Sequence, residues 1–182
     1  MNLLEMLLDD KNSSAIGEIA RQFNLNPDQA KSAMGQIAPA LAKGLQNNVS
    51  QGGLGDLMSA LGKGNHQRYL DDPSSLASAD SLQDGNNILG HIFGSKDVSR
   101  QVASQAASQT GLDDGMIKKM LPMVASLAMG AMSKNAASSG MLGASSAGQD
   151  SGVAGMLASF LDADKDGSIV DDLASMAGKF FR

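Results

Sequence analysis

The sequence predicts an all-α protein, and three observations lead to this prediction. Strand signals are nearly missing, because the 182 residues contain one Tyr and no Trp and show no alternating β-branched run. Apolar residues instead recur at helical spacing along much of the chain. Aromatic content is 3% while Met occurs 12 times, so the core must be built from Leu, Ile, Ala and Met.

The first predicted helical module spans residues 1–50. Asn2 can cap a short helix over Leu3–Leu8. A second helix is predicted to start at Ser13 or Ser14 and to end near Asn24. Its apolar residues lie on one face and are Ile16, Ile19, Ala20 and Phe23.

The third helix of this module is marked by its start signals. Asn26 is a good N-cap, Pro27 suits the first helical position, and Asp28 places a negative charge in the first turn. We expect this helix to continue to about Leu45 with a kink at Pro39.

The second predicted module, residues 86–134, echoes the first. Asn87-Ile88-Leu89 resembles Asn2-Leu3-Leu4, and each module has a long helix with one internal proline, Pro39 or Pro122. We interpret the likeness as an internal duplication. The alternative is that any two Ala/Ser-rich helical hairpins look alike.

The remaining segments are predicted from composition. Residues 51–85 are expected to connect the modules, with a short helix at Gly53–Leu61 and irregular structure over Lys63–Leu82. Residues 135–151 are rich in Ala, Ser and Gly, which is typical of a flexible linker. Residues 152–182 are expected to form a helix, a loop and a second helix.

The loop of this last segment carries the sharpest chemical signal, a DxDxDG motif. Its proposed calcium ligands follow the order of an EF-hand, with carboxylates at positions 1, 3 and 5, a backbone carbonyl at 7 and a closing carboxylate; they are Asp162, Asp164, Asp166, Ser168 and Asp172. Gly167 permits the sharp turn. Leu173 stands where an EF-hand has a bidentate Glu, so we expect modest affinity. The alternative is a turn whose Asp171 or Asp172 caps the last helix.

Composition argues against several other classes. The formal net charge is -5, so the chain has no electrostatic reason to bind nucleic acid or an anionic membrane. Cysteine is absent, which excludes disulfides and thiolate sites. The N-terminus lacks a basic signal region, and the longest apolar run, Met120–Met132, is too short to span a bilayer. We therefore expect a cytoplasmic protein without a membrane span.

A helix-turn-helix pattern is present in both modules, but its DNA chemistry is weak. The first candidate recognition helix offers Gln29, Lys31 and Gln36, and the second offers Lys118 and Lys119. Neither contains arginine, and both become wholly apolar, so we expect a packing arrangement without DNA binding.

Catalytic motifs are also missing. His66 lies in the connector and His91 on a predicted helix, where it has no obvious Asp or Ser partner nearby in sequence; no nucleophile elbow or phosphate loop is found. We expect no enzyme activity.

The Met-rich run from Met120 to Met132 is apolar on all sides, which predicts a buried central helix. A sharper alternative is a surface for self-association, because Ala125, Ala128 and Ala131 would allow close approach and Met adapts to partners.

The chain resembles the YidB-like bacterial family of unknown function. The residues that carry this resemblance are Gly85–Gly94 and Lys118–Ala125. The resemblance implies a homeodomain-like helical fold and a bacterial source, and it supplies no active site. Our functional hypothesis is a bacterial helical interaction protein with a calcium-binding C-terminal loop. The alternatives are a metal-free, self-associating scaffold and, less favoured, a DNA-binding protein.

Overall fold

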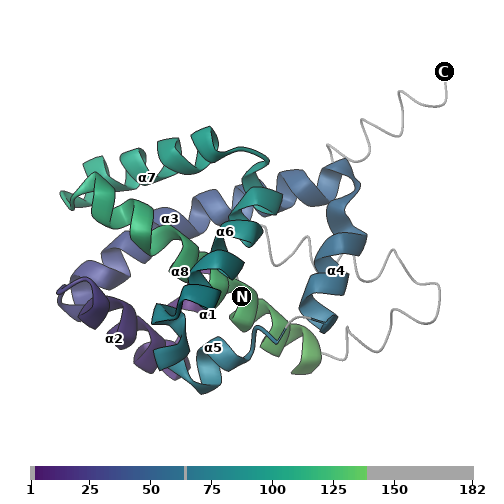
Figure 1. Ribbon diagram of the computed structural model, residues 1–182, viewed down its shortest axis with the longest axis horizontal. Helices are drawn as coiled ribbons and strands as arrows, with labels where there is room; N and C mark the ends of the chain where they lie inside the picture. Colours follow the sequence, from purple (N-terminus) through teal and green to yellow (C-terminus); the bar gives the residue numbers. More distant parts are fainter. Residues whose placement is uncertain (1–2, 64, 139–182) are drawn as a thin grey trace.

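The computed structural model describes residues 3–63 and 65–138, and Figure 1 shows the arrangement of their helices. Every secondary-structure element in these two ranges is helical, which confirms the all-α prediction there. The predicted helix-loop-helix at 152–182 and most of the predicted linker lie outside the described residues.

The N-terminal helices follow the expected order. They are α1 (Leu3–Leu7), the 3-10 turn η1 (Asp10–Asn12), α2 (Ser13–Gln22) and α3 (Pro27–Asn48). The start of α3 is a full capping box: Asn26 Oδ1 accepts from the Gln29 N–H at 2.8 Å, and Gln29 Oε1 accepts from the Asn26 N–H at 3.0 Å. The predicted N-cap is therefore confirmed, and α3 continues through Pro39.

The segment between the modules is more helical than expected. It contains η2 (Val49–Gly53), α4 (Leu54–Lys63), α5 (Arg68–Asp71) and η3 (Pro73–Ala77). Helix α6 (Ala79–Phe93) then begins inside the stretch that was expected to be irregular. The prediction of irregular structure at 63–82 is wrong because Ser78 is an N-cap, whose Oγ accepts from the Ser81 N–H at 3.2 Å.

Two further helices complete the described chain: α7 (Lys96–Thr110) and α8 (Asp114–Ser138). The turns that precede α3 and α8 share a left-handed residue, Asn24 with φ 52° and Gly111 with φ 71°. Each module thus ends in a turn followed by a long helix with an internal proline. The internal duplication and the homeodomain-like arrangement stay predictions.

Helix α8 is the centre of the hydrophobic core. Every residue from Met120 to Ser133 is buried, and α8 contacts each of the helices α1 to α7. Figure 1 shows α8 crossing the middle of the described helices, overlaid by α6. The prediction of a buried central helix is confirmed. Because the chain itself covers the Met-rich surface, this surface is not available for self-association.

Close approach to α8 depends on two glycines that lack a side chain. A Cβ at Gly85 in α6 would clash with the carbonyl group of Pro122. A Cβ at Gly130 would stand 2.6 Å from the carbonyl oxygen of His66, just before α5. Both carbonyls are backbone groups, so neither clash can be relieved by turning a side chain.

We predict that Gly85→Ala destabilises the protein by about 1–3 kcal/mol, because the added methyl group forces α6 away from α8. Gly90→Ala is the matched control in the same helix, where nothing lies within 4 Å of the added Cβ. This control should stabilise the protein by roughly 0.5–1 kcal/mol. Urea unfolding followed by circular dichroism measures both, and equal stability of the two variants would contradict the packing described here.

Candidate functional site

The calcium ligands predicted from sequence all lie outside the described residues. These are Asp162, Asp164, Asp166, Ser168 and Asp172. Within residues 3–63 and 65–138, no group of three or more His, Asp or Glu side chains is placed to hold a metal ion. The structure therefore does not test the calcium prediction.

A polar cluster that sequence reasoning missed joins the α4–α5 region to α6. His66 Nδ1 lies 3.1 Å from Asp84 Oδ2, and the Tyr69 hydroxyl donates to the same oxygen at 2.7 Å. Arg68 Nη2 donates to the Tyr69 oxygen at 2.8 Å, and its guanidinium lies 4.9 Å from the centre of the Tyr69 ring. We call His66, Arg68, Tyr69 and Asp84 the polar latch.

Burial explains why the latch must be fully hydrogen-bonded. Tyr69 is completely buried and His66 is 8% exposed, so an unpaired polar atom on either would be unfavourable. Burial is also the main cause that raises the pKa of the Tyr69 phenol, and the bond to Asp84 raises it further while Arg68 opposes both. The phenol consequently remains a hydrogen-bond donor to Asp84 at neutral pH.

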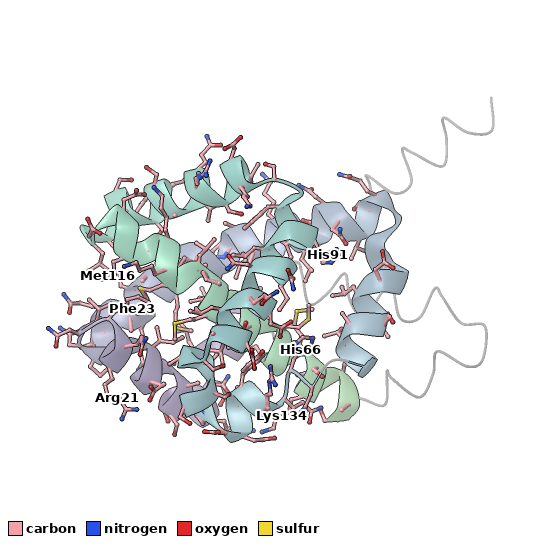
Figure 2. The ribbon with its side chains drawn as sticks, in the orientation of Figure 1. Arg21, Phe23, His66, His91, Met116 and Lys134 are labelled. Carbon is pink, nitrogen blue, oxygen red and sulfur yellow. The ribbon has the colours of Figure 1, made fainter. Side chains whose placement is uncertain are left out.

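Two sets of contacts hold α5 against the core: the polar latch to α6 and backbone contacts to α8. Ser133 Oγ donates to the Leu61 carbonyl at 2.9 Å, and the chain at His66 lies directly against Gly130. Among the described residues no hydrogen bond joins the His66 ring to a hydroxyl that could act as a nucleophile. His91 lies in the last turn of α6, where its backbone carbonyl accepts from Asn48 Nδ2, and Figure 2 labels it apart from His66.

A second polar feature is an open groove of about 490 Å³ between α6, α7 and α8. We call it the basic groove; its lining residues are Asn86, Leu89, Gly90, Ser95, Lys96, Ser99, Arg100, Lys118 and Leu121. Leu89 and Leu121 are buried and form an apolar floor. The lining includes three cationic side chains and no carboxylate.

The cations of the groove are held loosely. Arg100 Nη1 lies 2.9 Å from Asp97 Oδ1, and these side chains are 65% and 88% exposed. Lys118 pairs with Asp114, and both side chains are nearly half exposed. Exposed ion pairs of this kind contribute only about 0–1 kcal/mol, so a ligand carboxylate can replace either acid at little energetic cost.

The start of α7 adds to the positive potential. Ser95 is its N-cap, and its Oγ accepts from the Val98 N–H at 3.3 Å. The N-terminus of a helix carries a partial positive charge from the aligned peptide dipoles. Since Ser95, Lys96 and Ser99 all line the groove, the end of α7 and the cationic side chains act on the same space.

Sequence reasoning missed this groove, although part of its signal was present. Lys96 and Arg100 are four residues apart, as are Ser95 and Ser99, which places each pair on one side of a helix. Lys118 belongs to a candidate recognition helix and to the stretch that carries the family resemblance, and neither pattern indicates a groove. The convergence of Lys118 with α7 requires the left-handed Gly94 (φ 68°) between α6 and α7, which a helical pattern does not reveal.

We predict that Asp84→Ala destabilises the protein by about 1–3 kcal/mol, because it removes the shared acceptor of the buried His66 and Tyr69. Asp80→Ala is the matched control, an exposed aspartate in the same helix, and should change stability by less than about 0.5 kcal/mol. Thermal and urea unfolding of both variants measure the difference. A loss no larger for Asp84 than for Asp80 would show that the latch does not stabilise the fold.

None of the helices in the described ranges has the length and apolar character that a membrane span requires.

No curated protein and no solved structure matches the chain. One family model matches residues 5–135, which include all of α2 to α7 and most of α8, and its description is "Bacterial protein of unknown function (DUF937)". The match ends before the aspartate-rich loop, and the narrower resemblance to YidB-like proteins stays a prediction. Because the match covers more than half of the sequence, the chain belongs to this bacterial family of unknown function, DUF937.

Proposed function

We propose that this protein is a non-enzymatic, helical binding protein whose basic groove takes acidic segments of protein partners. The observation that carries the proposal is the groove lining, in which Lys96, Arg100 and Lys118 come together; the lining has no carboxylate, and the acids that pair with Arg100 and Lys118, Asp97 and Asp114, do not belong to it. This concentration of positive charge occurs in a chain whose formal net charge is -5. A local cationic site in an acidic protein favours a short acidic ligand over a long polyanion, which the overall charge would repel.

The floor of the groove narrows the ligand class further. Leu89 and Leu121 are buried apolar residues, and an inorganic anion would gain nothing from them. A peptide that alternates carboxylates with aliphatic side chains can use both the cationic rim and the apolar floor. The groove volume of about 490 Å³ is also within the range of small-ligand sites, which hold several side chains.

We predict that an amidated peptide of alternating Asp and Leu, Asp-Leu-Asp-Leu-Asp, shifts the amide resonances of Ser95, Ser99 and Leu89 saturably in the ¹⁵N-labelled full chain. The groove variant Lys96→Gln/Arg100→Gln/Lys118→Gln should lose this response, because each substitution removes a cation while keeping a polar side chain of similar reach. Chemical-shift titration at low ionic strength is the measurement.

The matched control is Lys11→Gln/Lys31→Gln/Lys43→Gln, which removes the same charge from exposed positions outside the groove. It should respond as the original chain does. If the peptide shifts resonances elsewhere, or if both variants lose binding equally, the groove is not the site and only net charge matters.

We also propose that the C-terminal loop binds calcium, which would make the protein responsive to this ion. The support comes from the sequence: aspartates at positions 1, 3 and 5, Gly167 at position 6 and Asp172 near the closing position. The missing Glu at position 12 leads us to expect weaker binding than in a sensor EF-hand.

We predict saturable heat on titrating calcium into the full chain by calorimetry, and its loss in Asp164→Ala/Asp166→Ala. The control Asp150→Ala/Asp171→Ala removes the same charge outside the proposed ligand set and should retain binding. Absence of heat and of thermal stabilisation at millimolar calcium would reduce the loop to a helix-capping turn.

A further inference from the structure

We propose that the occupant of the basic groove is the chain's own aspartate-rich segment, Asp162–Asp172. This inference rests on the proposed function of the groove, since it names the acidic segment that the groove takes. The segment becomes a ligand held on the same chain, so that an external partner must displace it.

Charge complementarity is the first argument. The segment contains five aspartates, at positions 162, 164, 166, 171 and 172, against one lysine, Lys165. Ile169 and Val170 lie between the aspartates and supply the aliphatic groups that suit the floor formed by Leu89 and Leu121. The segment thus combines the two chemistries that the groove offers.

The described chain has three pairs of adjacent aspartates, and one member of each pair already accepts a backbone hydrogen bond. Asp9 Oδ1 accepts from the Lys11 N–H at 2.9 Å, and Asp72 Oδ1 accepts from the Ser74 N–H at 3.2 Å. Asp113 Oδ1 accepts from the Met116 N–H at 3.0 Å at the start of α8. These aspartates cap helices within the fold, whereas Asp162–Asp172 offers more carboxylates in one short stretch.

The chain is long enough for the segment to reach the groove. Helix α8 ends at Ser138, and its 20-residue course back to Lys118 is about 30 Å long. The 23 residues from 139 to 161 can span up to about 75 Å. A segment joined by such a connection is presented to the groove at an effective concentration on the order of millimolar, so modest affinity suffices for occupancy.

The absence of cysteine allows a direct test on the full chain. A nitroxide attached at Ala163→Cys lies between two of the aspartates. In calcium-free, low-salt buffer it should reduce the peak heights of the Ser95, Ser99 and Leu89 amides relative to the chemically reduced label. The groove variant Lys96→Gln/Arg100→Gln/Lys118→Gln should abolish this loss of peak height, and the control Lys11→Gln/Lys31→Gln/Lys43→Gln should retain it.

Unchanged groove amides in the nitroxide-labelled chain would overturn the inference, as would broadening that survives in the groove variant. A sample that mixes ¹⁵N-labelled chain without nitroxide and unlabelled chain with nitroxide should show no broadening. Broadening there would assign the segment to a neighbouring copy and overturn same-chain docking.

Titration with the Asp-Leu peptide distinguishes failure of this inference from failure of the proposed groove function. If the peptide binds the groove while the nitroxide leaves it unchanged, the groove function stands and only the occupant is wrong.

Discussion

Burial of α8 is the constraint on which the rest of the described structure depends. A helix that is apolar on all sides from Met120 to Met132 must be covered completely, and the seven other α-helices of the described residues all contact it. The covering helices can come close only where backbone meets backbone, at Gly85 against Pro122 and at Gly130 against His66. The hydrophobic effect thus selects the arrangement, and two glycines allow it at native packing density.

The same arrangement places the polar features. At one end of α8, Lys118 is exposed while Leu121 is buried, so α6 and α7 meet the helix where its surface changes from polar to apolar. The basic groove lies at this change. Near the other end, Gly130 and Ser133 contact the backbone that leads into α5. The polar latch joins the same segment to Asp84 of α6. The latch places hydrogen-bonded side chains in a largely buried region, whereas the basic groove carries exposed cations.

The fold could be predicted to the extent that it depends on local signals. The cap at Asn26, the helix break at Asn24 and the burial of the Met-rich run all follow from residue type and helical spacing. The start of α6 at Ala79 was missed because polar residues around Ser78 are equally typical of a loop and of an N-cap. The basic groove and the polar latch were missed because their residues are far apart in sequence. Asp84 meets His66 18 positions away, and only packing brings them together.

The two proposed activities involve the same carboxylates. Asp162, Asp164 and Asp166 would be calcium ligands in one case and partners of Lys96, Arg100 and Lys118 in the other. A carboxylate that coordinates a calcium ion has little capacity left to bind the cations of the groove. The two proposals together therefore imply that calcium and the groove compete for the same aspartates. The basic groove of the folded helices would then bind these aspartates whenever calcium does not.

The most direct measurement is a crystal structure of the full chain with the Asp-Leu-Asp-Leu-Asp peptide. Our account predicts peptide carboxylates within hydrogen-bond distance of Lys96, Arg100 and Lys118, with leucine side chains against Leu89 and Leu121. A peptide bound on another surface, with the groove cations still paired only to Asp97 and Asp114, would contradict the claim that this groove is the binding site.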